Sequence, residues 1–109
     1  MTFWQKFLSF FKHSKWEYRV ADMCLSHSYK ALKLDCKHRV KILADEMIKA
    51  GETFEIWYGI YPPTPHVWIE QNGVILDPTI YHNDLNKYKK QKLIDIIELN
   101  DIIEYYRKK

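Results

Sequence analysis

The stretch "HVWIEQNGVILDPT", residues 66–79, decides how this chain folds, because it contains two strands and the turn that joins them. An Asn-Gly pair between two apolar runs favours a two-residue hairpin turn of type I′, and here that pair is Asn72-Gly73. This turn fixes the register and places Ile69 opposite Leu76. The sequence therefore predicts an antiparallel hairpin in a defined alignment.

The same register places a histidine and an aspartate on one face of the hairpin. Side chains alternate between the faces of a strand, so His66 and Trp68 share a face with Asp77. Asp77 is the diagonal neighbour of His66, roughly 7–8 Å away by backbone position. An imidazole and a carboxylate in this arrangement can form a hydrogen bond. The residues alone leave open whether that bond is structural or belongs to a catalytic triad.

A cysteine supplies the third group that such a triad needs. The apolar spacing predicts a helix from about Cys36 to Ala50, with Asp35 as its N-cap and Gly51 just past its end. At a helix N-terminus the dipole favours the thiolate form of a cysteine. Positive charge follows directly along the chain, from Lys37, His38 and Arg39. A triad requires that this helix N-terminus packs against the His66 face, and local spacing does not show that docking.

The remaining pattern predicts an α+β fold in one domain spanning residues 1–109. Helices come first, then an antiparallel sheet, then a closing helix. The expected strands are Thr53–Tyr61, His66–Gln71 and Val74–Leu76. Helices are expected over Glu17–Leu34 and from Asn83 onward, although "IIEYY" (102–106) could pair as an edge strand instead.

Composition limits the classes of function. The chain has 109 residues, a formal net charge of +3 and two cysteines. This mild charge does not favour a dedicated nucleic-acid-binding protein. Two cysteines are too few for a disulfide framework, so we expect a reducing, cytoplasmic location. Residues 3–16 carry apolar side chains at helical spacing with lysines nearby. They predict a terminal helix docked on the core, a peripheral contact with a membrane surface, or a helix that binds a partner.

An ordered set of motifs resembles a known family. "DCKHRVKILADEMIKAGETFEIWYGIY" followed by "HVWIEQNGVILDPT", about residues 35–80, is similar to the core of the transglutaminase-like superfamily of papain-fold cysteine enzymes. The resemblance implies N-terminal helices packed on a small antiparallel sheet, and a compact core like that of lasso-peptide leader peptidases. It implies that Cys36 is the nucleophile, His66 the general base and acid, and Asp77 the orienting carboxylate.

The resemblance also sets expectations for ligands. The substrate would be a peptide or protein amide, resolved through a thioacyl intermediate by water or an amine. Trp68 is expected to contact that substrate, and neither a cofactor nor a metal ion is expected. The oxyanion-hole donor is left unassigned, with the Cys36 backbone N–H as the default.

Two rival interpretations stay open at this point. Cys24 could replace Cys36 as the nucleophile, because "CLSHSYKAL" also begins a helical stripe. Alternatively, the chain is a non-catalytic binding module that contacts an acidic partner or nucleic acid through "KYKKQK" (87–92) and the terminal "RKK". The plainer interpretation of these lysines is a solvated helix face.

Overall fold

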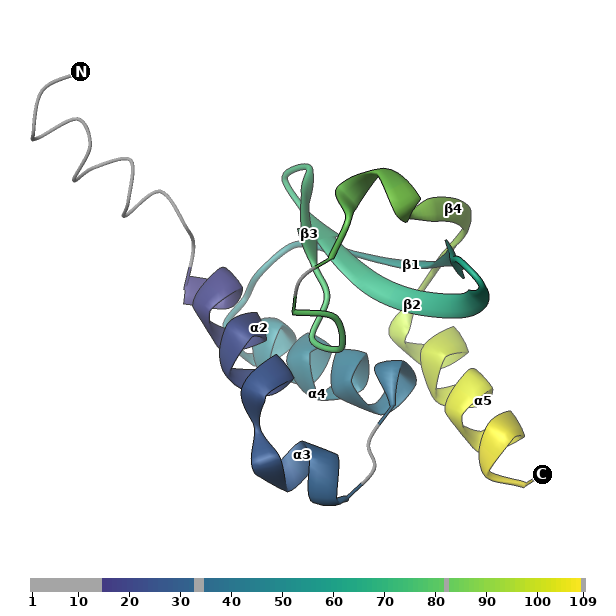
Figure 1. The fold of residues 1–109 in the computed structure, drawn as a ribbon, viewed down its shortest axis with the longest axis horizontal. Coiled ribbons are helices and arrows are strands. Elements are labelled where there is room, and N and C mark those ends of the chain that lie inside the picture. The colour runs from purple at the N-terminus through teal and green to yellow at the C-terminus, as the bar shows by residue number, and fades with distance from the viewer. Residues whose placement is uncertain (1–14, 33–34, 82, 109) are drawn as a thin grey trace, which may run out of the picture.

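The computed structural model describes residues 15–32, 35–81 and 83–108, and within them it shows an α+β fold (Figure 1). The helices are α2 (Lys15–Leu25), α3 (His27–Ala31), α4 (Cys36–Lys49) and α5 (Ile96–Arg107), with a 3₁₀ turn η1 at Leu85–Lys87. The strands are β1 (Glu55–Tyr61), β2 (Thr64–Gln71), β3 (Val74–Leu76) and β4 (Lys89–Ile94). They form one antiparallel sheet in the order β3-β2-β1-β4.

The hairpin predicted from the Asn-Gly pair is confirmed. Ile69 pairs with Leu76, and the neighbouring pairs follow the same register. Asn72 and Gly73 have φ values of 52° and 77°, which are the two positive values that a type I′ turn requires. The turn chemistry therefore controls which side chains of β2 and β3 share a face.

Helix α4 also begins and ends where its capping residues predict. The Asp35 carboxylate accepts a hydrogen bond from the His38 backbone N–H at 3.3 Å, which satisfies a free donor of the first turn. Gly51 follows the helix with a φ of 74°, the left-handed conformation common just after a helix. The helix packs on β2 through buried side chains, namely Val40, Leu43, Ala44 and Met47.

The single helix expected over Glu17–Leu34 is wrong, because the chain breaks at Ser26. Helix α2 ends at Leu25, and the Ser26 side chain accepts a hydrogen bond from the Tyr29 N–H at 3.3 Å. A serine caps a new helix more favourably than it continues an old one. The apolar periodicity runs through the break and conceals it.

The helix expected from Asn83 onward is also wrong over its first half. The chain forms η1 and then β4, which pairs with β1, for example Tyr58 with Lys92. All residues of β4 except Ile94 are exposed, so the strand lacks the apolar alternation that would predict it. The "IIEYY" segment lies in α5, which starts at an Asp95 N-cap and is not an edge strand.

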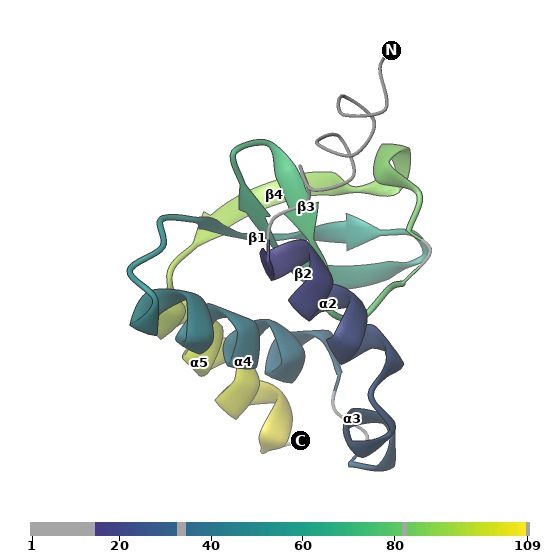
Figure 2. The ribbon, with the colours of Figure 1, turned by 90° about the vertical axis from the view of Figure 1, so that its left-hand side faces the viewer.

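Helices α2, α4 and α5 lie on one face of the sheet, as Figures 1 and 2 show from two directions. The core between these layers includes Met23 from α2, Leu43 from α4 and Leu99 from α5, packed against inward side chains of the strands. The connection from β3 to β4 passes from one edge of the sheet to the other (Figure 1). We call its described residues, 77–81 and 83–88, the crossing segment.

Gly59 marks a close approach of three strands. It pairs with His66 of β2 and with Lys90 of β4, beside an irregularity in the β1–β4 register. A Cβ atom at Gly59 would lie 2.1 Å from the Lys89 carbonyl oxygen and 2.8 Å from the Trp68 ring. Only glycine fits at this position.

The predicted membrane contact involves residues 3–16. Residues 3–14 of that segment lie outside the described residues. Within the described ranges, no helix is both long and apolar enough to cross a bilayer.

Candidate functional site

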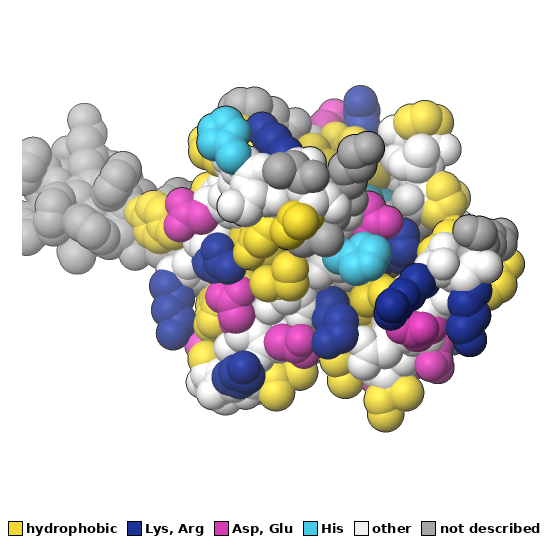
Figure 3. Space-filling view, turned by 90° about the horizontal axis from the view of Figure 1, so that it is seen from below, with side chains coloured by type: hydrophobic (Ala, Val, Ile, Leu, Met, Phe, Trp, Pro, Cys, Tyr) yellow, Lys and Arg dark blue, Asp and Glu magenta, His cyan; other side chains and the backbone are white. Residues whose placement is uncertain are grey.

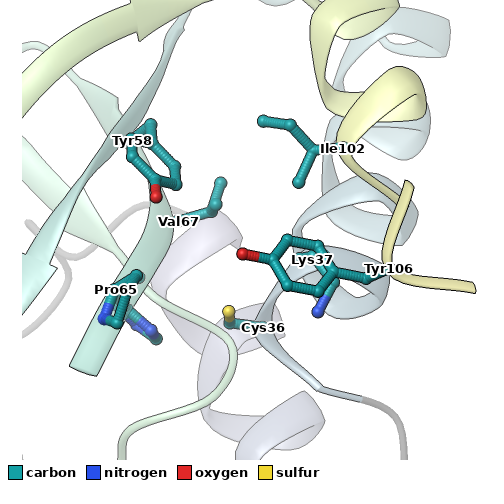
Figure 4. A pocket seen from close by; sticks show the side chains of 8 residues that line it. Cys36, Lys37, Tyr58, Pro65, Val67, Ile102 and Tyr106 are labelled. Atoms are coloured by element: carbon teal, nitrogen blue, oxygen red, sulfur yellow. The ribbon is translucent and has the colours of Figure 1, made fainter. Parts of the chain in front are cut away.

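The N-terminus of α4 and the beginning of β2 meet at a small cavity. Its volume is about 190 Å³, and both Cys36 and His66 line it. Figure 4 shows the Cys36 sulfur pointing into this cavity, with the hydroxyls of Tyr58 and Tyr106 around it. The helix end therefore docks beside the histidine, which local spacing alone left open.

His66 connects the thiol to a buried carboxylate. Its Nε2 lies 2.7 Å from Asp77 Oδ2, and the two residues are 6% and 1% exposed. Cys36 lines the same cavity and is close enough to influence the pKa of His66. Because Nε2 faces Asp77, Nδ1 is the ring nitrogen left for the thiol. The structure thus brings together the three residues that the sequence predicted.

The surroundings of His66 favour its protonated form. Burial opposes the positive charge, but hydrogen bonds to Asp77 and Cys36, together with their charge, raise the pKa of His66 to about 9. The imidazole is therefore mostly an imidazolium at pH 7 and loses its proton only as the pH rises through about 9. The resulting positive charge lies on the wall of the same cavity as the Cys36 side chain.

Asp77 is held by two further donors. The Thr79 backbone N–H donates to Oδ1 at 3.0 Å, and the Tyr88 hydroxyl donates to Oδ2 at 2.6 Å. Tyr88 thus shares one carboxylate oxygen with His66. The sequence prediction placed Tyr88 on a helix face and missed this role, because the strand that follows it carries no apolar alternation.

Tyr88 is itself fixed from several sides. Its ring packs edge-on against Trp68 and Tyr61, each with ring centroids 4.9 Å apart, and its hydroxyl accepts a hydrogen bond from Asn83 at 3.0 Å. Burial and the neighbouring Asp77 charge raise the pKa of Tyr88 far above its usual value. The phenol therefore remains protonated and donates to Asp77 over the whole physiological range.

Trp68 does not lie where a substrate could reach it. The side chain is fully buried, at 0% exposure, and its indole N–H donates to Glu70 at 3.3 Å. The ring lies roughly parallel to His66, with centroids 6.1 Å apart. The structure thus corrects the expected substrate contact, and Trp68 supports the rings of His66 and Tyr88 instead.

The rival nucleophile Cys24 is in an unreactive position. It is 6% exposed, and its thiol donates to the Asp77 carbonyl oxygen at 3.5 Å. Burial, followed by the Asp77 charge, raises the pKa of Cys24 to about 11. Both cysteines are free thiols, and Cys36 is the one that is partly exposed. This arrangement favours Cys36 over Cys24.

The positive charges that follow Cys36 are mostly engaged elsewhere. Lys37 and His38 both pair with the Asp35 carboxylate, in the second case at 2.8 Å. The Arg39 guanidinium is buried and donates to the Pro78 carbonyl at 3.3 Å, next to Asp77. The helix end and His66 are therefore the main sources of positive potential at the thiol.

No family model matches this chain, and neither a curated protein nor a solved structure matches it. The likeness to transglutaminase-like enzymes therefore remains a prediction from the motifs. Among the described residues, no group of three or more His, Cys, Asp or Glu side chains could hold a metal ion.

Removing the Tyr88 hydroxyl should strengthen the hydrogen bond between Asp77 and His66. In Tyr88→Phe the shared oxygen loses one donor and becomes a stronger acceptor. We expect the pKa of His66 to rise further, by about 1 to 2 units, because hydrogen bonds to charged groups contribute about 1.5–3 kcal/mol. An NMR titration of the His66 ring measures this shift. Tyr105→Phe, on the exposed side of α5, is the control, and an unchanged or lower pKa in Tyr88→Phe would contradict the shared-oxygen geometry.

Proposed function

We propose that this protein is a cysteine-dependent hydrolase or acyltransferase that acts on a peptide or protein amide, with a compact core of the transglutaminase-like, papain-fold type. The observation that carries the proposal is the Cys36 thiol at a helix N-terminus beside His66, which a buried Asp77 holds at 2.7 Å. The order of elements supports the fold assignment, since the cysteine begins α4, the histidine lies on β2 and the aspartate follows β3.

The reaction follows from these positions. The Cys36 thiolate attacks the amide carbonyl carbon, a C–S bond forms, and the carbonyl electrons move to oxygen. As the tetrahedral species collapses, the C–N bond breaks and the His66 imidazolium gives its proton to the leaving amine. His66 then takes a proton from water or a second amine, which attacks the thioester. The products are an acid or a new amide, and the thiol is regenerated.

Asp77 orients the base in this scheme. Its contact with Nε2 keeps the proton of neutral His66 on that nitrogen and leaves Nδ1 to face the thiol. Because the imidazolium is the proton donor, turnover of an amide should fall as the pH rises through about 9, the pKa of His66. Since a nucleophilic thiol must stay reduced, we place the protein in the cytoplasm as part of the proposal.

The alternative function is a binding module that uses the basic strand β4. Two of its lysines are already paired, Lys90 with Glu70 at 2.9 Å and Lys92 with Glu98 at 2.7 Å. On the helical side seen from below, basic, acidic and apolar side chains are interspersed (Figure 3). These pairings favour the enzyme and make a nucleic-acid partner the weaker candidate. Salt-dependent retention on heparin would favour the binding module.

Limited alkylation tests the enzyme proposal. With iodoacetamide near pH 6, Cys36 should react at least about tenfold faster than glutathione, because an ordinary thiol is almost entirely protonated at that pH. Mass spectrometry locates the modified cysteine, and the buried Cys24 should remain unmodified. His66→Ala should reduce the rate at Cys36 to that of an ordinary thiol.

His38→Ala is the matched control for that experiment. His38 lies two residues from Cys36 but pairs with Asp35 on the exposed side of the helix end, so its loss should leave the Cys36 rate within about threefold. Slow and equal labelling of both cysteines in the wild-type protein contradicts the proposal.

A further inference from the structure

The attack on a carbonyl creates a negatively charged oxygen that needs hydrogen-bond donors. Donors fixed in advance in a partly dry site contribute more to the rate than most other groups. One donor is the Cys36 backbone N–H, because N–H groups in the first turn of a helix have no partner within it. A second donor must come from the walls of the cavity.

We infer that the Tyr58 hydroxyl is this second donor, an assignment that rests on the proposed function. Tyr58 lies on β1 and pairs with Val67, the neighbour of His66 on β2. It lines the same cavity as Cys36 and His66. Figure 4 shows its hydroxyl directed toward the end of the cavity that Cys36 and Pro65 line. A carbonyl carbon above the sulfur would therefore place its oxygen between the helix end and the phenol.

The Tyr58 hydroxyl is available for this role. The side chain is partly buried, yet its hydroxyl forms no hydrogen bond with any residue in the described part of the chain. A phenol on a cavity wall that makes no bond to the described protein can donate its hydrogen to a molecule bound in that cavity. The neighbouring walls, Val67 and Ile102, are apolar, and they strengthen a hydrogen bond by lowering the local dielectric.

Tyr106 is the competing phenol, and its position suits the role less well. Its hydroxyl also points into the cavity in Figure 4, but it comes from the last turns of α5 and its side chain is 47% exposed. The Lys37 ammonium lies 4.7 Å from the centre of its ring. A hydroxyl that must first give up bound water stabilises an oxyanion less than a hydroxyl that already lies in a partly dehydrated cavity wall.

The hydroxyl acts without transferring its proton. When Cys36 attacks, the electron pair of the C=O bond moves to oxygen, and the Tyr58 O–H donates a hydrogen bond to that oxygen. On collapse the pair returns, the C=O bond re-forms, and the leaving group departs. Alkylation by iodoacetamide differs, because the thiolate displaces iodide from a saturated carbon and no oxyanion forms. The two reactions therefore separate oxyanion binding from thiol activation.

The test compares Tyr58→Phe with Tyr106→Phe, using p-nitrophenyl acetate for acylation of Cys36 and iodoacetamide for alkylation. In Tyr58→Phe we expect the rate of p-nitrophenol release in the first turnover to fall about 100-fold, as for other single oxyanion donors. The alkylation rate should stay within about threefold of wild type. Tyr106→Phe should slow acylation less than Tyr58→Phe does, and Tyr105→Phe, on the exposed side of α5, should leave both rates within about threefold.

Three results with the variants would overturn the assignment. These are wild-type acylation in Tyr58→Phe, the loss of acylation in Tyr106→Phe instead, and an equal loss of both reactions in Tyr58→Phe. A wild-type protein that alkylates rapidly but is not acylated also rejects the oxyanion role and leaves the activated thiol intact. An ordinary alkylation rate at Cys36 in the wild type rejects the proposed function itself.

Discussion

Asp77→Asn is expected to slow acylation of Cys36 by p-nitrophenyl acetate by about 10⁴-fold, the loss seen when a triad aspartate becomes an amide. The carboxylate accepts from His66 at 2.7 Å and from Tyr88 at 2.6 Å on the same oxygen. A neutral amide no longer stabilises the imidazolium, so the pKa of His66 falls and the protonated form of the histidine is lost. Because Asp77 is 1% exposed, no water can replace the missing charge.

The matched control is Asp84→Asn on the same crossing segment. Asp84 is exposed and its side chain caps η1 by accepting from Asn86, a role that an asparagine fills equally well. Its acylation rate should stay within about threefold of wild type. Circular dichroism and the His66 NMR titration establish that the Asp77 variant is folded and that its histidine has become less basic. A folded Asp77→Asn protein with the wild-type rate would remove Asp77 from the mechanism.

Among glycine-to-alanine substitutions at the described glycines, Gly59→Ala is expected to destabilise the protein most. The new Cβ would lie 2.1 Å from a backbone oxygen of β4, so the strand must move. We expect the free energy of unfolding to fall by about 3 kcal/mol, the upper end of the usual range for overpacking. Displacement of β4 also moves Tyr88 away from Asp77, so the pKa of His66 should rise in whatever fraction remains folded, as in Tyr88→Phe. Urea unfolding, followed by tryptophan fluorescence, measures the first effect.

Gly73→Ala separates this clash from the general effect of removing a glycine. Gly73 has a φ of 77°, and a Cβ atom at this position would have no other atom within 4 Å. Alanine there should therefore lower the free energy of unfolding by only about 1 kcal/mol, through backbone strain. Equal losses at Gly59 and Gly73 would show that β1 and β4 do not approach as closely as described.

Local sequence signals predicted those parts of the fold that depend on neighbouring residues. The Asn72-Gly73 turn defines its own register, and Asp35 and Gly51 delimit α4 by capping chemistry. From these two elements the positions of Cys36, His66 and Asp77 followed, because each residue lies within or directly beside them. Their meeting required one long-range contact, the docking of α4 on β2, which only the structure provides.

The elements that were missed are those whose conformation depends on distant partners. Strand β4 is built from exposed lysines and forms because β1 offers a free edge, which no property of "KKQKLI" reveals. Tyr88 acquires its role only once that strand is in place. Trp68 was expected to contact the substrate, but its side chain is buried and packs against Tyr88 of the crossing segment. The break at Ser26 is a local signal, and the continuous apolar stripe outweighed it.

The crossing segment connects the site to both edges of the sheet. Asp77 follows β3 at one edge of the sheet, and Tyr88 precedes β4 at the other edge. Their 2.6 Å hydrogen bond therefore joins the two edges through side chains rather than through the backbone ladder. Because His66 shares the same Asp77 oxygen, the pKa of this one histidine should respond to a displacement of either edge strand. One NMR signal would thus report on the integrity of the whole sheet.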